Sequence, residues 1–361
     1  MAPRPERTTR CAAPTLKVGS HNVRGLGNPL KAAAATTLWT QQKLDVILLQ
    51  ETKLSLFSMA RITASLKGWR RAYWCHGRDA GPSAGSEARP ARGVAILVRD
   101  GCPLVVDTGS VHSLHSGADA GNLIHFKAKW GGHRLHIASI YLPNEPTKQK
   151  TFINTHLRPL KASLPADTKL LWGGDFNFVP DVALDRMSRV ADITGSHPDT
   201  GVQRVWERHL PDLLDAYRIR HPTTRSYTHF SPTSAARLDR FFVCGDMQPY
   251  VAFAGLSAAG PVSTDHRLVT VAILRQPGST DALPPGAIHR PPPAIRRVRL
   301  GFAEDPQLLG DLQHWVAARL QHAPADAAAL LNWWPTFKSA LARRCFALAY
   351  LARVQHRAAI Q

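Results

Sequence analysis

The sequence predicts an α/β protein in which two mostly antiparallel sheets pack together and helices lie outside them. Two observations support this fold class. Apolar runs of strand length recur between residues 16 and 274, and stretches with helical spacing lie between them. With 361 residues, 44% of them hydrophobic, the chain is long enough for one large core or for two domains.

The first part of the chain alternates strands and helices. Residues 16–23 alternate apolar and polar side chains as a strand does, and 45–51 is a continuous apolar run that predicts a strand buried on both faces. Helices are expected over the Ala-rich stretch 31–42 and over 57–67, and another strand over 69–76.

The middle of the chain predicts an antiparallel meander. Its four strand-like runs, separated by turn residues, are 93–99, 104–111, 122–130 and 134–142. A helix is expected over 147–164. The next buried strand ends at Gly173-Gly174, where glycines let the backbone bend or let another group approach it closely.

The pattern then becomes irregular before the last strands. Residues 185–200 are polar, and 201–214 has helical spacing, although Pro211 leaves the end of that helix open. Four closing strands are expected, over 227–230, 238–244, 250–256 and 268–274.

Composition divides the chain into four parts. Residues 1–14 predict a disordered basic leader. Within the main domain, the Gly-, Ser-, Ala- and Pro-rich stretch 77–91 predicts a flexible surface loop. The expected parts are the leader 1–14, a domain over 15–275, a Pro-rich linker over 276–300 and a helical tail over 301–361. Within the tail, 307–321 predicts an amphipathic helix.

The charge balance indicates a polyanionic partner. Lys+Arg is 45 against Asp+Glu 26, which gives a formal net charge of +19. That excess fits nucleic acid or an acidic membrane surface, although a generally basic proteome can produce it without function. The five scattered cysteines show no CxxC or zinc spacing and predict reduced thiols. No signal peptide or membrane-spanning run is evident, so an intracellular, and with a DNA partner nuclear, location is expected.

Polar residues follow the strands at several points. Asp175 and Asn177 lie two apart after the Gly-Gly pair, so in extended geometry they share one face and together can position and deprotonate a water. Taken alone, this pair fits a turn closing a strand better than a catalytic pair. The full set of strand-end residues is Asn22, Glu51, Tyr141, Asn144, Asp175, Asn177, Asp239, Asp265 and His266. Each alone fits a surface residue, an ion pair or a helix cap, but rigid strand ends are also where such folds place chemistry.

The order and spacing of the whole set resemble the endonuclease/exonuclease/phosphatase superfamily, which includes DNase I and exonuclease III-like enzymes. The motifs that carry the resemblance span residues 16–274 and are His21-Asn22-Val23-Arg24-Gly25, Leu49-Gln50-Glu51-Thr52, Ile140-Tyr141-Leu142-Pro143-Asn144, Gly173-Gly174-Asp175-Phe176-Asn177, Arg237-Leu238-Asp239-Arg240-Phe241 and Ser263-Thr264-Asp265-His266. Their forms look most like the endonuclease domain of LINE-type (non-LTR) retrotransposons. The resemblance implies a four-layer α/β sandwich and a DNA endonuclease that leaves a 3′-hydroxyl.

The resemblance also implies a metal site. Glu51 would be the main ligand of Mg²⁺ or Mn²⁺, assisted by Asn22 and Asp265. Exonuclease III-like enzymes usually carry an Asp two residues after the first Asn. Arg24 occupies that place here, which argues against an abasic-site repair enzyme and leaves the metal site depending on Glu51.

The remaining implied roles concern the reaction itself. Asp175 would be the base on the attacking water and Asn177 would orient that water, while His266, oriented by Asp239, would stabilise the charge that builds up on phosphorus. The residues implied to contact the scissile phosphate or DNA are Tyr141, Asn144 and Thr228.

Two other functions remain open at this stage. One is a phosphatase or phospholipase of the same superfamily, since a basic surface also suits acidic lipids. The other is an inactive retroelement fragment that only binds nucleic acid. The Pro-rich linker and the tail resemble the spacer before a reverse transcriptase, so a longer polyprotein is also expected.

Overall fold

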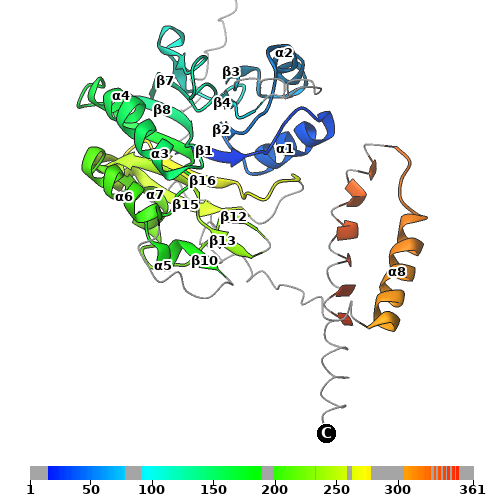
Figure 1. Cartoon of the computed structure of the whole chain (residues 1–361). Helices are drawn as coiled ribbons and strands as arrows, with labels where there is room; N and C mark the ends of the chain where they lie inside the picture. The colour runs from blue at the N-terminus through cyan, green and yellow to red at the C-terminus, as the bar shows by residue number, and fades with distance from the viewer. Residues whose placement is uncertain are drawn as a thin grey trace, which may run out of the picture. The chain divides into compact units, whose positions relative to one another are not determined.

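The structure is a computed structural model of the chain (Figure 1). It describes residues 15–77, 91–188, 198–231, 233–257, 262–277 and 305–326, together with separate helical residues between 329 and 348. The chain divides into two compact units, residues 1–288 and 289–361. The first unit carries all the elements that matter for the site.

A six-stranded sheet forms one half of the first unit. Its strands, in spatial order, are β15 (Val251–Leu256), β16 (Val269–Leu274), β1 (Thr15–Asn22), β2 (Val46–Gln50), β4 (Val94–Val98) and β3 (Arg71–Cys75). Only β1 and β2 pair in parallel, and the other neighbours are antiparallel. The parallel pair brings the carboxyl ends of two strands to the same edge of the sheet.

A larger sheet forms the other half. Its order is β11 (Leu213–Asp215), β14 (Asp239–Cys244), β9 (Lys169–Asp175), β8 (His133–Tyr141), β7 (Leu123–Trp130) and β5 (Val105–Val106), and β6 (His112–Ser113) also pairs with β7. Here too one central pair, β8 with β9, is parallel. Three short strands, β10 (Arg186–Ser188), β13 (Ser234–Ala236) and β12 (His229–Phe230), form a separate small sheet.

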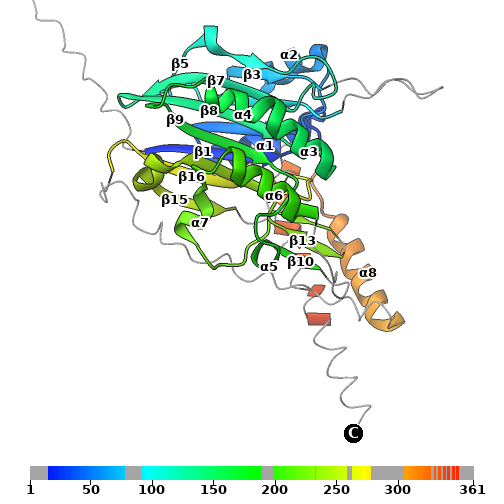
Figure 2. The same ribbon diagram turned by 60° about the vertical axis from the view of Figure 1, so that its left-hand side comes forward.

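Helices cover the outer faces of both sheets (Figures 1 and 2). On the six-stranded sheet these are α1 (Pro29–Gln41) and α2 (Leu56–Ser65). On the larger sheet they are α3 (Pro146–Phe152), a π-helical turn (Ile153–Leu157), α4 (Arg158–Ala162) and α6 (Pro198–His209). Short helices α5 (Val182–Asp185), α7 (Ala216–Arg220) and the 3₁₀ turns Thr108–Ser110 and Gly245–Tyr250 complete the unit, and α8 (Pro306–Leu320) belongs to the second unit.

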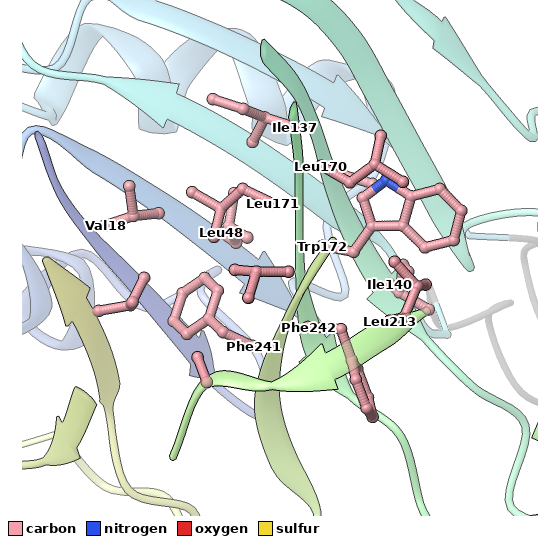
Figure 3. Packing of buried hydrophobic residues seen from close by; sticks show 14 of the residues in the cluster. Val18, Leu48, Ile137, Ile140, Leu170, Leu171, Trp172, Leu213, Phe241 and Phe242 are labelled. Atoms are coloured by element: carbon pink, nitrogen blue, oxygen red, sulfur yellow. The ribbon is translucent and has the colours of Figure 1, made fainter. Parts of the chain in front are cut away.

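The main core lies between the two sheets (Figure 3). Val18 and Leu48 face Leu171 and Phe241 of the other sheet. Because side chains alternate along a strand, the residues on either side of Leu48 point the other way and pack beneath α1 and α2. The strand β2 is therefore buried on both faces, as its continuous apolar run predicts.

The expected fold class is confirmed, but one part of the predicted topology is wrong. The four-strand meander is split between sheets, because β4 inserts between β2 and β3 while β5, β7 and β8 belong to the larger sheet. The predicted strand over 104–111 is only Val105–Val106 followed by the 3₁₀ turn Thr108–Ser110. Sequence spacing shows that strands are present but not which sheet each one joins.

The predicted helix over 201–214 is also corrected. It ends at His209, and Leu213–Asp215 forms strand β11. Pro211 explains the end of the helix, since proline has no N–H to donate and its ring clashes with the preceding turn. The strands β10, β11 and β13 were not expected because each has only three residues.

Some sequence predictions fall outside the described residues. These are the leader 1–14, most of the loop 77–91 and most of the linker 276–300. In the tail, the helix predicted over 307–321 is present as α8. The four described cysteines are all free, and no helix in the described ranges has the length and apolar character needed to cross a bilayer.

Buried His136 and half-buried His125 form a hydrogen-bonded chain on the larger sheet. Trp172 Nε1 donates to His136 Nδ1 at 2.9 Å, which leaves His136 Nε2 to donate to His125 Nδ1 at 3.1 Å. Burial lowers the pKa of His136 to about 3 and that of His125 to about 4. Both rings are therefore neutral in the folded protein.

Acid should destabilise the fold through this pair. Above pH 6.5 the two histidines are neutral whether folded or unfolded, so their stabilising effect is fully present. Between pH 6.5 and about 4 the unfolded chain binds protons that the folded chain excludes, which costs about 1.4 kcal/mol per pH unit for each group. We expect the unfolding free energy from urea titrations to fall between pH 7 and 5, and to fall less steeply in His136→Gln. An equal slope in both proteins would contradict the assignment.

Gly174 allows the closest backbone approach in the larger sheet. A Cβ added there would lie 1.8 Å from the carbonyl oxygen of Ile140, whereas one added at Gly245 would meet nothing within 4 Å. We expect Gly174→Ala to lower the unfolding free energy by about 3 kcal/mol, the upper end of the usual overpacking cost. Gly245→Ala is the matched control and should be neutral or slightly stabilising. Urea titration of both variants measures the difference, and similar values would show that the close approach is unimportant.

Candidate active site

The candidate site lies where the central strands of both sheets end. Tyr141, Asp175 and Asp239 are direct register partners on β8, β9 and β14. On the other sheet, Asn22 is the last residue of β1, and Glu51 directly follows β2. Residues far apart in sequence thus converge because parallel strands end at a common edge.

The side chain of Asn22 links the two sheets. Its Nδ2 donates to Glu51 Oε1 at 3.0 Å and to Asp175 Oδ2 at 2.9 Å. The Asn22 side chain is fully buried, and its Oδ1 accepts from the Arg24 backbone N–H at 3.0 Å. A single carboxamide therefore fixes the spacing between two carboxylates that the two sheets bring together.

Glu51 is held as a carboxylate. Its Oε1 also accepts from the hydroxyl of Tyr141 at 3.2 Å, and its Oε2 lies 2.7 Å from Lys53 Nζ. Burial favours the neutral acid, but the hydrogen bonds from Asn22 and Lys53 and the charge of Lys53 outweigh it, so the pKa of Glu51 is lowered. Its backbone φ of +50° turns the chain sharply as it leaves β2.

Asp175, like Asp239, is almost completely buried. Burial, and then the nearby Asp239 carboxylate, raise the pKa of Asp175 to about 6. The backbone N–H of Asn177 donates to Asp175 Oδ1 at 3.0 Å, and Asn177 Nδ2 donates to the Leu142 carbonyl at 2.7 Å. Asn177 itself has φ +50°, so the chain reverses directly after Asp175. The extended geometry predicted for Asp175 and Asn177 is therefore wrong, because a turn separates them and directs the Asn177 carboxamide to Leu142.

His266 and Asp239 form a hydrogen-bonded pair beside Asp175. His266 Nδ1 donates to Asp239 Oδ2 at 2.8 Å, and His266 Nε2 lies 3.8 Å from Asp175 Oδ2. Burial opposes a charge on His266, but the two carboxylates outweigh it and raise its pKa to about 10. The imidazolium is thus held with one N–H on Asp239 and the other facing Asp175.

Tyr141 and Asn144 lie at the edge of the group. The Tyr141 hydroxyl is 3.5 Å from Asn144 Oδ1, and Asn144 is exposed. Burial and the charge of Glu51 raise the pKa of Tyr141, so its hydroxyl stays protonated and available as a donor. The Tyr141 hydroxyl thus donates to Glu51 and lies near the Asn144 carboxamide, which is open to solvent.

The direct DNA contact expected of Thr228 is corrected. Its side chain is fully buried, and its Oγ1 accepts from the backbone N–H groups of Leu238 and Asp239, each at 2.9 Å. Such a side chain has no exposed surface to offer a ligand. Thr228 instead fixes the first residue of β14 and so the position of Asp239.

Asp265 is paired with the Arg24 guanidinium and lies near His229, whose pKa is lowered by burial. Its Oδ2 lies 2.5 Å from Arg24 Nη1 and 3.6 Å from His229 Nε2. The His229 ring lies 4.7 Å from the His266 ring. The sequence analysis singled out neither the Arg24–Asp265 pair nor His229, and only the structure brings them together.

A buried charge network supports the strand that carries Asp239. Arg237 Nε and Nη2 donate to the two oxygens of Asp185 at 2.7 and 2.9 Å, and Arg237 Nη1 lies 2.7 Å from Asp215 Oδ2. Arg218 also pairs with Asp185. These acids raise the pKa of Arg237 despite its burial. In the sequence, Arg237 lies two residues before Asp239, which connects this network to the site. From the sequence alone, an arginine there equally fits a surface ion pair.

The donor set fits a hard divalent cation at Glu51. The Glu51 carboxylate is ionised, partly exposed, and already holds the Lys53 ammonium, which is a stand-in for a cation. Mg²⁺ suits such a site, because it keeps several waters and binds through one or two carboxylates plus substrate phosphate. Asn22 and Asp265 are less available, since Asn22 directs Nδ2 at both acids and Asp265 is paired with Arg24.

Comparison with known proteins agrees with this geometry. Residues 19–266 match the model of the Endonuclease/Exonuclease/phosphatase family, a segment that contains every residue of the candidate site. Among solved structures, an AP endonuclease from Archaeoglobus fulgidus is similar at 19% sequence identity with a TM-score of 0.54. The match covers 72% of this chain and 99% of that one. The likeness confirms the expected DNase I-like fold with two packed sheets and outer helices.

Removing the Arg237 guanidinium from the buried network should lower the unfolding free energy. Arg237→Met leaves two buried acids without their shared partner, and we expect a loss of about 3 kcal/mol in unfolding free energy. Arg134 pairs with Asp167 at the surface, where both side chains are more than half exposed. Arg134→Met is therefore the matched control and should change stability by less than about 0.5 kcal/mol. Equal effects in thermal or urea melts would mean that the buried network does not support the fold.

Proposed function

The chain belongs to the endonuclease/exonuclease/phosphatase family, and on this basis we propose that it is a divalent-metal-dependent endonuclease that nicks DNA and leaves a 3′-hydroxyl. One observation carries the proposal. Asp175 lies between Asn22 and Glu51 on one side and the His266–Asp239 pair on the other. That arrangement supplies a base, a cation site and a donor around one point, as hydrolysis of a phosphodiester requires.

Glu51 is the proposed main ligand of Mg²⁺ or Mn²⁺. A bound cation supplies positive charge to the phosphate oxygens and to the departing oxygen. Lys53 Nζ occupies one oxygen of Glu51 and is about one-third exposed, so it can move aside to the surface. Asn22 assists only if it releases the two acids that it holds, and Asp265 assists only if it releases Arg24.

The protein groups divide the remaining work. Asp175 takes the proton of the attacking water as the new oxygen–phosphorus bond forms, and Asn177 orients that water. A pKa near 6 leaves Asp175 ionised at neutral pH yet basic enough to accept the proton. The bond from phosphorus to the 3′ oxygen then breaks, and the released 3′ oxygen takes a proton to become the hydroxyl.

Charge stabilisation falls to the donors on the opposite side. His266 directs its Nε2 N–H toward the centre of the site, and Asp239 holds the ring by its other nitrogen. Tyr141 and Asn144 are proposed to hold the scissile phosphate through the hydroxyl and the carboxamide. Strands fix Tyr141 and Asp239, and Asp239 in turn holds His266, before substrate arrives, which is the condition for strong electrostatic stabilisation.

DNA is the proposed substrate, and target-site cleavage by a LINE-type retrotransposon is the proposed setting. The net charge of +19 suits a polyanion. The motifs Asn-Val-Arg-Gly-Leu at 22–26, Ser-Tyr-Thr-His-Phe-Ser at 226–231 and Ser-Thr-Asp-His at 263–266 have the forms of that group. A nuclear location and continuation into a reverse transcriptase belong to the same proposal.

Nicking of supercoiled plasmid tests this function. With Mg²⁺ we expect open-circular product whose ends a DNA polymerase extends directly, and none with chelator. Asp175→Asn and Glu51→Gln should each lower the rate by about 10²–10⁴-fold. Asp181→Asn is the matched control, because Asp181 only caps α5 by accepting from Ala183 and Leu184, and asparagine caps equally well.

Several results would oppose the proposal. Unchanged nicking in folded Asp175→Asn would remove the assigned base, and nicking in chelator would remove the cation. Hydrolysis of a phosphoinositide but not of plasmid would place the substrate among lipids. DNA binding with no cleavage under any metal would indicate a protein that only binds nucleic acid. Circular dichroism of each variant confirms that the fold is retained.

A further inference from the structure

We propose that Leu30, Leu56 and Phe57 form an apolar rim that packs against DNA beside the scissile phosphate. The inference rests on the proposed function and adds a substrate contact to it. It concerns the first turns of α1 and α2, which the sequence motifs do not include.

These side chains are unusually exposed. Phe57 is 82% exposed, Leu56 68% and Leu30 56%. Within the part of the first unit that the structure describes, one other large hydrophobic side chain, Val105, is comparably exposed. Three exposed apolar side chains lie at the starts of two neighbouring helices. Such grouping indicates a binding surface, whereas single exposed apolar residues do not.

The rim is tied directly to the catalytic strands. After β1 and β2, the two loops run side by side, with Gly25 N–H bonded to Glu51 C=O at 2.6 Å and Leu26 N–H bonded to Thr52 C=O at 2.9 Å. The loops then enter α1 and α2, which pack against each other (Figure 1). Phe57 thus follows Glu51 by six residues and lies in the first turn of α2, the helix that this loop enters.

Basic side chains accompany the rim. Lys53 pairs with Glu51, and Lys31 Nζ donates to the Arg24 carbonyl at 3.1 Å. Burial and the charges of Lys53 and Arg24 lower the pKa of Lys31, which places the three cations near one another. Arg61, one helical turn after Phe57, is also exposed.

This combination favours DNA as the occupant. Lys53 is paired with Glu51 and Arg24 with Asp265, but Lys31 and Arg61 have no carboxylate partner among the described residues. A face for another protein copy or for an apolar ligand gains nothing from these two cations, whereas a polyanion does. An exposed aromatic ring beside cations is the arrangement that contacts bases or sugars while the cations contact phosphates. Leu56 adds apolar surface next to Phe57 on α2, and Leu30 adds it on the first turn of the neighbouring α1.

Binding of a fluorescein-labelled 30-base-pair duplex tests the rim. Anisotropy is measured in an Asp175→Asn background, so that binding is read without cleavage. We expect Phe57→Ala to weaken binding about ten-fold at every salt concentration, and Phe57→Trp to restore it. Lys31→Ala should instead reduce the dependence of affinity on salt by about one ion. Val105→Ala is the matched control and should bind as the parent does.

The readouts keep this inference separate from the proposed function. With Asp175 intact, Phe57→Ala should raise KM for plasmid about ten-fold while hydrolysing bis(p-nitrophenyl) phosphate as the parent does. If no variant cleaves DNA but Phe57→Ala still weakens duplex binding, the rim stands and the proposed reaction falls. Binding within two-fold of the parent overturns the rim. So does a Phe57-dependent dimer by light scattering, or Phe57-dependent binding to phosphatidylserine vesicles without an effect on DNA.

Discussion

The hydrogen bonds of one carboxamide hold the centre of this molecule together. Asn22 ends β1 in the first sheet and joins Glu51 beside it to Asp175 on the second sheet. Without such a donor, two carboxylates brought to this edge would repel each other, and neither sheet could fix the position of the other's acid. The packing of the two sheets is thus matched to the spacing of the two charged groups.

The same principle governs the opposite side of Asp175. Here a cation, His266, separates Asp175 from Asp239, and its pKa rises because both acids stabilise its charge. Thr228 accepts from the backbone N–H of Asp239, and Arg237, two residues before Asp239, pairs with buried Asp185. The site is therefore a row in which each acid is bordered by a donor or a cation, and its rigidity derives from backbone ladders and buried charges.

Much of this was predictable from the sequence, for definable reasons. Asn22 ends a strand with alternating apolar and polar residues, while Glu51 and Asp175 follow continuous apolar runs, so these strands and their polar ends are visible in the sequence. The membership of β4 in the first sheet could not be predicted from the sequence, because pairing depends on contacts between distant strands. Thr228 was misjudged for a related reason, since its hydroxyl is consumed by local backbone donors that spacing does not reveal.

The placement of β1 has a consequence for synthesis in the cell. It pairs with β16, the last strand of the first unit, and Thr264 Oγ1 donates to the Asn22 carbonyl at 3.0 Å. Within this unit, the strand that is synthesised first must therefore wait for the last one before this edge is closed. His266 is made shortly before β16, so a nascent chain lacks an assembled centre until that late segment has been made. The proposed DNA-cutting activity is thus absent from any product that terminates before His266.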